Sequence, residues 1–194
     1  MNRVVITGAG TINALGATVP ETLQAMREGR LGIGPLHMRD LDRLSVKIGA
    51  QIKDFDPEIY FDRQKLALYD RVTQLTLMAS REAMGQSGLE ITDELSESTG
   101  VVLGTAAGGM NTWDDNFRSV YEDGKNRVHP FVVPKLMNNA AASHLSMAYN
   151  IKGPSLTVST ACASSNHAIG LAFQMVRSGM AQVMLAGGAD AMLT

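Results

Sequence analysis

Short apolar segments that end in glycine or other small residues alternate with segments of helical periodicity along this chain. The apolar segments are rich in valine, isoleucine and leucine, as buried strands are. Strands separated by helices pair in parallel, so the pattern predicts an α/β layered fold with a mainly parallel mixed sheet flanked by helices. The expected strands are Arg3–Thr7, Thr99–Leu103, Leu156–Val158 and Gln182–Ala186.

The clearest expected helix has apolar residues at three- and four-residue spacing and stops at Gly88. The irregular stretch before it contains a possible small hairpin near Val46–Ile52. No repeat or low-complexity linker interrupts the chain, so residues 1–194 are expected to form one domain. The expected helices are Val19–Glu28, Asp70–Gln86, Asn111–Glu122, Lys135–Tyr149 and Ala163–Arg177.

The last of these helices is apolar on most of its sides. A helix of this kind has to be covered all round, which places it inside a protein and not on its surface. A chain of 194 residues with so few strands has little left to cover both faces of it. The pattern therefore predicts that a further polypeptide segment packs against this helix.

The composition excludes several classes of function. The chain is 45% hydrophobic and 19% charged with a formal net charge of −2, which favours neither nucleic-acid binding nor attraction to an anionic membrane. No apolar run is long enough to span a bilayer. The apolar run at the start of the sequence is too short for a signal peptide, so a cytoplasmic location is expected. The histidines, at positions 37, 129, 144 and 167, show no metal-ligand spacing, and neither a metal nor a cofactor is expected.

The single cysteine, Cys162, follows an expected strand and precedes the apolar helix. One cysteine cannot form an internal disulfide, in agreement with a reducing compartment. Spacing alone favours an inert, buried cysteine at such a position. However, the N-terminus of a helix favours a thiolate, and its N–H groups can stabilise an oxyanion. The small residues beside Cys162 would also leave room for a thioester carbonyl.

Several motifs in a fixed order resemble the β-ketoacyl-acyl carrier protein synthases of the thiolase superfamily, and most closely the elongating type II enzymes. The segment around Cys162 (Val158–Gly170) is similar to the nucleophile segment of that family. The other matching segments are Arg3–Gly10 with Leu15-Gly16, Gly104–Gly109, His129–Pro134, Asn138-Asn139, Gly153-Pro154 and Ala186–Asp190.

The resemblance implies a thiolase-like five-layered fold built from two similar halves, of which this chain matches the N-terminal half. It implies a decarboxylative Claisen condensation in which Cys162 accepts the acyl group of a thioester primer and malonyl-acyl carrier protein supplies the extending unit. Two histidines and a lysine assist the family's nucleophile, and all three belong to the absent C-terminal half. Such enzymes usually pair as homodimers and have acyl carrier protein as their partner.

The resemblance also implies substrate contacts at Ala107, Gly108, Val132 and Ala163. Family members that stop at medium chain length tend to have a bulkier residue at the position of Ala107, and an aromatic residue often stands at that of Val132. Both residues are smaller here, which suggests a roomier acyl pocket unless other residues refill it. Carrier-protein docking is expected at Arg63 and Lys65, although the density of positive charge there is low.

Four other interpretations compete with a complete synthase. A thiolase acting on coenzyme A thioesters also carries its nucleophile at a helix start. A ketosynthase-like partner subunit is disfavoured because such partners lack the cysteine, whereas an incomplete, inactive fragment remains open. A dinucleotide-binding turn at Gly8-Ala9-Gly10 is rejected because residue 13 is Asn13, where the G-x-G-x-x-G spacing requires glycine.

Overall fold

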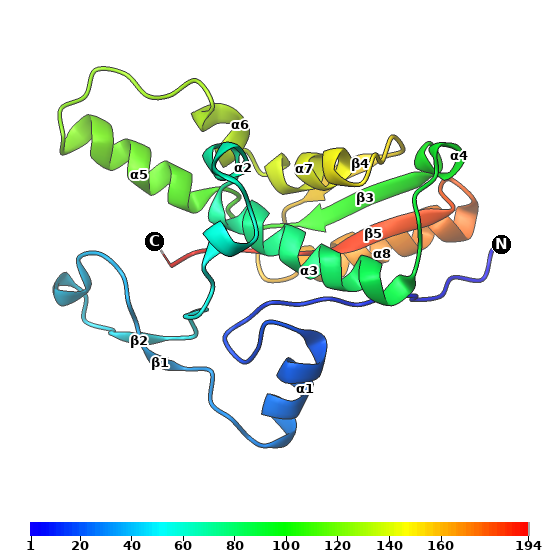
Figure 1. The fold of residues 1–194 in the computed structure, drawn as a ribbon, viewed down its shortest axis with the longest axis horizontal. Coiled ribbons are helices and arrows are strands. Elements are labelled where there is room, and N and C mark those ends of the chain that lie inside the picture. The colour runs from blue at the N-terminus through cyan, green and yellow to red at the C-terminus, as the bar shows by residue number, and fades with distance from the viewer. Residues whose placement is uncertain (194) are drawn as a thin grey trace.

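The centre of the structure is a parallel three-stranded sheet in the order β4–β3–β5 (Figure 1). The strands are β3 (Thr99–Gly104), β4 (Ser155–Val158) and β5 (Val183–Gly188). The structure is a computed structural model that describes residues 1–193, so the last residue of the expected domain, Thr194, lies outside the described residues. The expected α/β fold and three of the four expected strands are confirmed.

Helices cover the sheet, and short elements connect them. None of the described helices combines the length and the apolar character needed to cross a bilayer. The helices are α1 (Val19–Arg27), α2 (Arg63–Leu68), α3 (Arg71–Ser87), α4 (Asp93–Ser96), α5 (Met110–Tyr121), α6 (Val132–Leu136), α7 (Ala140–Ala148) and α8 (Ser164–Ser178), with single turns at Leu41–Arg43 and Pro57–Ile59 and a two-stranded ribbon of β1 (Gly34–Pro35) and β2 (Ile48–Gly49).

The central strand β3 is buried along its whole length, because helices lie on both faces of the sheet. Val101 and Leu103 pack with residues of α3 and α7 on one face. Val102 packs with Ala168 and Ala172 of α8 on the other. This two-sided burial explains why β3 is a continuous apolar run without polar alternation.

The first turn of α8 lies directly against the carboxyl ends of two strands. A Cβ atom added to Gly104 would lie 2.3 Å from the carbonyl carbon of Ser164 and 2.5 Å from the backbone nitrogen of Ser165. A Cβ added to Gly188 would lie 2.2 Å from the Ser165 Oγ and 2.6 Å from the Gly104 carbonyl oxygen. A side chain at Gly104 would therefore push the helix start away from the sheet, and one at Gly188 would collide with the Ser165 side chain and with the backbone of β3.

The face of α8 away from the sheet is open in this chain. Ile169, Leu171 and Phe173 are 49%, 39% and 37% exposed, although all three are large apolar residues. Leu156 on β4 is also exposed. The sequence predicted a helix that needs cover on all sides, and the described chain supplies that cover on one side only.

The expected first strand, Arg3–Thr7, is not part of any sheet, so this prediction is wrong. The segment leads into a stretch that lies against α3, where the Gln86 Oε1 accepts a hydrogen bond from the Ala9 N–H (2.6 Å) and the Glu82 Oε2 accepts one from the Thr11 N–H (2.9 Å). A β-branched run favours extended backbone, but a strand also needs a neighbouring strand to pair with. None of the described strands lies in ladder register with it.

The expected helix Lys135–Tyr149 is also wrong in its extent, because α6 and α7 are separate helices. Met137 has extended backbone, with ψ at 143°. The Leu136 carbonyl accepts a hydrogen bond from the Gly109 N–H (3.1 Å) instead of continuing the helical ladder. Contact with a distant glycine loop therefore interrupts a sequence with good helical periodicity.

The possible hairpin near Val46–Ile52 is not a local hairpin. Only Ile48 and Gly49 form a strand, and they pair antiparallel with Pro35 and Gly34. The partner strand lies thirteen residues earlier, and no local signal in the sequence marks it (Ile48↔Pro35).

Replacing Gly104 by alanine tests whether the sheet and α8 need this close approach. In the intact protein, Gly104→Ala should lower the free energy of unfolding by at least about 2 kcal/mol, because the new methyl overlaps backbone atoms that cannot move independently. The matched control is Gly85→Ala on α3, where an added Cβ meets nothing within 4 Å. That change should be neutral or stabilise by about 0.5–1 kcal/mol. Chemical denaturation measures both, and equal stability of the two variants would contradict the packing argument.

Candidate active site

The three parallel strands end level with one another, so the turns that follow them meet at one edge of the sheet. Gly104 pairs with Val158 of β4 and with Gly188 of β5. The turn after β3 contains residues 105–109, and the turn after β4 contains residues 159–163. Parallel α/β sheets bind their ligands outside this carboxyl edge, which makes it the candidate active site.

Cys162 lies in the turn between β4 and α8, immediately before the N-cap residue Ala163. The cysteine side chain is exposed in this chain. The first N–H groups of α8 and the positive end of its dipole point toward this turn, and both favour a negative charge. The expected position of Cys162 at a helix start is confirmed, whereas the alternative of a buried core cysteine does not fit its exposure.

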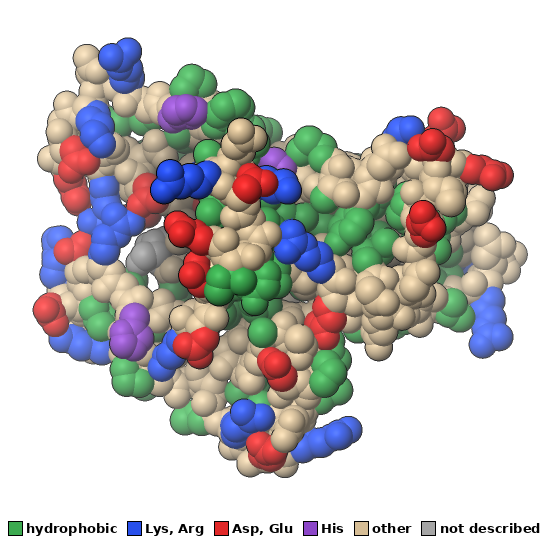
Figure 2. Space-filling view, in the orientation of Figure 1, with side chains coloured by type: hydrophobic (Ala, Val, Ile, Leu, Met, Phe, Trp, Pro, Cys, Tyr) green, Lys and Arg blue, Asp and Glu red, His purple; other side chains and the backbone are tan. Residues whose placement is uncertain are grey.

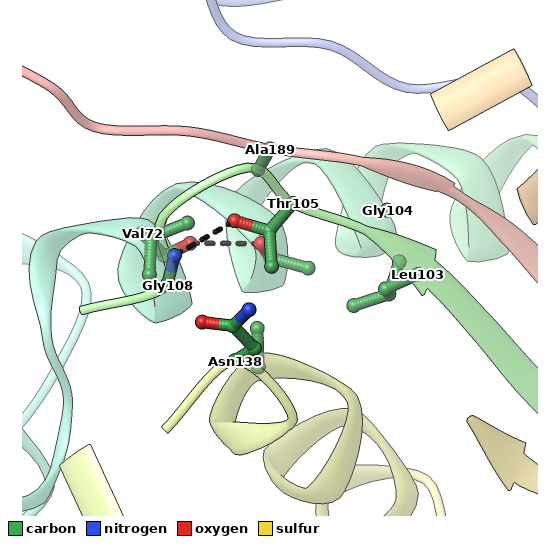
Figure 3. A pocket seen from close by; sticks show the side chains of 9 residues that line it. Val72, Leu103, Gly104, Thr105, Gly108, Asn138 and Ala189 are labelled. Atoms are coloured by element: carbon green, nitrogen blue, oxygen red, sulfur yellow. Dashed lines mark hydrogen bonds between the residues drawn. The ribbon is translucent and has the colours of Figure 1, made fainter. Parts of the chain in front are cut away.

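The glycine loop after β3 is organised by one carboxylate. Asp190, just beyond β5, accepts hydrogen bonds from the Thr105 Oγ1 (2.8 Å), the Ala106 N–H (2.9 Å) and the Ala107 N–H (3.2 Å). The Thr105 Oγ1 in turn accepts one from the Gly108 N–H (3.0 Å), as Figure 3 shows. Gly108 has a φ of 61°, which glycine adopts without steric cost. The loop is thereby tied to the end of the neighbouring strand.

A second carboxylate fixes the end of the same loop. Asp70, which is 2% exposed, caps α3 by accepting from the Val72 N–H at 3.0 Å. Its other oxygen accepts from the N–H and the hydroxyl of Thr112 in the first turn of α5, both at 2.7 Å. The loop between β3 and α5 is therefore anchored at both ends by carboxylates from other elements.

A small cavity lies beside this loop. Gly104, Thr105, Gly108 and Asn138 line it together with residues of α3, as seen in Figure 3. Its volume of about 10 Å³ is the space that a single water molecule needs. An acyl chain does not fit into this cavity of the described residues.

The residues expected to contact substrate come from three elements. Ala107 and Gly108 belong to the anchored glycine loop, and Ala163 is the N-cap of α8 beside Cys162. Val132 is the first residue of α6, which packs against α5 and α7. This helix reaches the loop through the hydrogen bond from the Gly109 N–H to Leu136. The described chain thus brings Cys162 and Ala163 together, and it places Ala107 and Gly108 in a neighbouring turn.

The residues expected to dock a carrier protein, Arg63 and Lys65, are exposed at the start of α2. The Asp62 carboxylate caps this helix through the Lys65 N–H (2.8 Å), which lowers the pKa of Asp62. It also lies 3.3 Å from the Lys65 Nζ, so part of the positive charge is offset locally. Figure 2 shows acidic and basic side chains interspersed over this face, in line with the low charge density noted in the sequence.

The sequence assigned no role to Gly104, Gly188, Asp190 or Ser164, yet these residues shape the edge where Cys162 lies. The repeated small residues after each strand were the available signal, because a close helix approach needs them. The partners of a single carboxylate or hydroxyl have no such signature in a sequence.

The beta-ketoacyl synthase N-terminal domain is the family whose model matches this chain, over residues 1–194. A nodulation protein E from a Rhizobium species is 42% identical over 97% of this chain and 47% of its own length. A 3-oxoacyl-acyl-carrier-protein synthase 2 from a Synechocystis species is 34% identical over 99% of this chain and 46% of its own length.

The fold agrees with this family. The solved structure of the ishigamide ketosynthase/chain length factor superposes with a TM-score of 0.87 at 27% identity, over 96% of this chain and 47% of that one. The chain therefore spans about half the length of the relatives it matches, and the thiolase-like fold is that of their N-terminal half. The motifs, the sheet and the position of the cysteine agree with this assignment. The chain belongs to the beta-ketoacyl synthase family and corresponds to the N-terminal domain of that family.

Proposed function

We propose that the protein completed by a C-terminal half is a β-ketoacyl-acyl carrier protein synthase with Cys162 as its acyl-accepting nucleophile. The observation that carries this proposal is the exposed Cys162 at the start of α8, on the edge where three parallel strands end. Membership of the beta-ketoacyl synthase family supports it. No cofactor is required by the proposed reaction.

The first stage transfers an acyl group to the protein. The Cys162 thiolate attacks the carbonyl carbon of an acyl thioester, the new carbon–sulfur bond forms, and the carrier leaves as its thiolate, which takes up a proton. The tetrahedral intermediate carries a negative oxygen, and the Cys162 N–H is the proposed donor to it. The positive end of α8 is the proposed electrostatic contribution to the stability of this oxyanion.

The second stage forms the carbon–carbon bond. A malonyl thioester on acyl carrier protein loses carbon dioxide, and the resulting carbanion attacks the acyl carbonyl on Cys162. The carbon–sulfur bond to Cys162 then breaks, which releases a β-ketoacyl carrier product and restores the thiolate. The groups that assist decarboxylation are assigned to the C-terminal half, so the 194-residue chain alone is proposed to be inactive in condensation.

The proposed partners are acyl carrier protein, the C-terminal half and a second copy of the intact subunit, in a cytoplasmic enzyme. Arg63 and Lys65 are the proposed contacts with the acidic carrier. The C-terminal half is proposed to pack against the exposed face of α8. Pairing of two subunits is supported by the position of β4 at the edge of the sheet and by the exposed aromatic stripe Trp113, Phe117 and Tyr121 on α5.

Incubation with an acyl thioester tests the nucleophile directly. The intact protein should gain the mass of one acyl group, and peptide mapping should place it on Cys162. Cys162→Ala should gain none and should lose condensation activity by at least about 10³-fold, as for other removed nucleophiles. The 194-residue chain alone should be labelled more slowly. Labelling of Cys162→Ala at the same rate as the unaltered protein would disprove the proposal.

The size of the residue at position 107 is proposed to set the acyl chain length. Ala107→Ile should reduce the rate with long acyl primers by about tenfold or more and leave the rate with short primers nearly unchanged, because the added carbons fill space needed by the distal chain. Ala106→Ile makes the same change one residue earlier, at an exposed position of the loop. Rates with a series of primer lengths measure the effect, and unaltered long-chain activity in Ala107→Ile would contradict it.

A further inference from the structure

The turn that carries Cys162 contains a strained residue. Ala161, immediately before the cysteine, has a φ of 51°. This left-handed conformation is unfavourable for a residue with a Cβ and persists only where surrounding contacts impose it. A residue released from it would return to an extended or right-handed conformation and rotate the Cys162 backbone away from its present direction.

One buried hydroxyl supplies contacts that hold this turn. The Ser164 Oγ accepts a hydrogen bond from the Thr160 N–H (2.9 Å) and donates one to the Ala161 carbonyl (2.6 Å). The Ser164 N–H donates to the same carbonyl (3.0 Å), and the Ala163 N–H donates to the Thr160 carbonyl (3.1 Å). The hydroxyl therefore bridges the two residues that precede Cys162.

Ser164 is itself held firmly in place. The side chain is 3% exposed, so its hydroxyl exchanges few contacts with water. Its backbone lies against Gly104 at the end of β3, at the contact that excludes a Cβ there. Packing against the sheet thus holds Ser164 in place. The Ser164 hydroxyl in turn holds the residues that precede Cys162.

From this geometry we infer that Ser164 is a positioning residue for Cys162, acting by holding Ala161 in its left-handed conformation. The inference rests on the proposed function of Cys162 for its catalytic consequence. The hydroxyl does not touch the reacting atoms. It sets the direction of the cysteine relative to the helix N-terminus, where a displacement of about 1 Å is enough to change a rate about a hundredfold.

A double-mutant cycle in the full-length protein tests this role. The rate of Cys162 alkylation by iodoacetamide is measured first, because it reports the placement of the thiol whether or not the protein transfers acyl groups. The acylation rate from an acyl thioester is measured second. Ser164→Ala should lower both rates by at least about tenfold. Ser178→Ala removes a hydroxyl from the other end of α8 and should leave both within about twofold.

The second arm of the cycle is Ala161→Gly, because glycine adopts a positive φ without steric cost. In the Ala161→Gly background, Ser164→Ala should lower the alkylation and acylation rates by less than about threefold. Glycine at position 161 adopts the positive φ without help from the Ser164 hydroxyl. An equal loss in both backgrounds would overturn the inference, and so would a loss below about threefold for Ser164→Ala in the unaltered background.

An isosteric pair covers the case in which Ser164→Ala does not fold. Ser164→Thr and Ser164→Val add the same volume, but only threonine keeps the hydroxyl. Ser164→Thr should react at least about tenfold faster with iodoacetamide than Ser164→Val, and equal rates would overturn the inference. The Ser164 variants could change the iodoacetamide rate as expected while Cys162 accepts no acyl group. That result would contradict the proposed function and leave the positioning role of Ser164 supported.

Discussion

The contact between the first turn of α8 and the glycine ends of β3 and β5 is the constraint on which the candidate site depends. Gly104 allows the backbone of the first helical turn to approach β3 at distances that no Cβ would permit, and Gly188 leaves room for the Ser165 side chain. The helix N-terminus is thereby brought to the carboxyl edge of the sheet, where Cys162 lies just before it. Since the same edge carries the glycine loop, one packing contact brings Cys162, a helix N-terminus and a second turn into one place.

Much of this architecture could be predicted because local and long-range signals agree in it. The apolar run of β3 is buried on both faces, as its sequence predicts. Helix α3 begins at the Asp70 cap and ends at Gly88, whose φ of 62° favours glycine. The start of α8 was predicted from a change from small residues to apolar periodicity. In each case the signal lies within a few residues of the structure it specifies.

Other features could not be predicted because their causes lie far away in the sequence. Arg3–Thr7 has the composition of a strand, but a strand also needs a neighbour to pair with. The break between α6 and α7 depends on a hydrogen bond from Gly109 to Leu136. The bridging role of Ser164 and the left-handed Ala161 are likewise invisible in a pattern of small residues. The sequence thus predicted the helix start beside the cysteine but not the hydrogen bonds within the turn that precedes it.

The open face of α8 connects the stability of the fold to the chemistry of the site. Ile169 is exposed on that face and follows Ser164, the first residue of the helix, by about 8 Å of helix rise. Whatever segment covers Ile169 and Phe173 must therefore approach within a few turns of Cys162. Such a segment would remove apolar surface from water and, by the same approach, limit the access of water to the Cys162 side chain. Covering the exposed face of α8 and enclosing Cys162 are therefore coupled through the geometry of one helix.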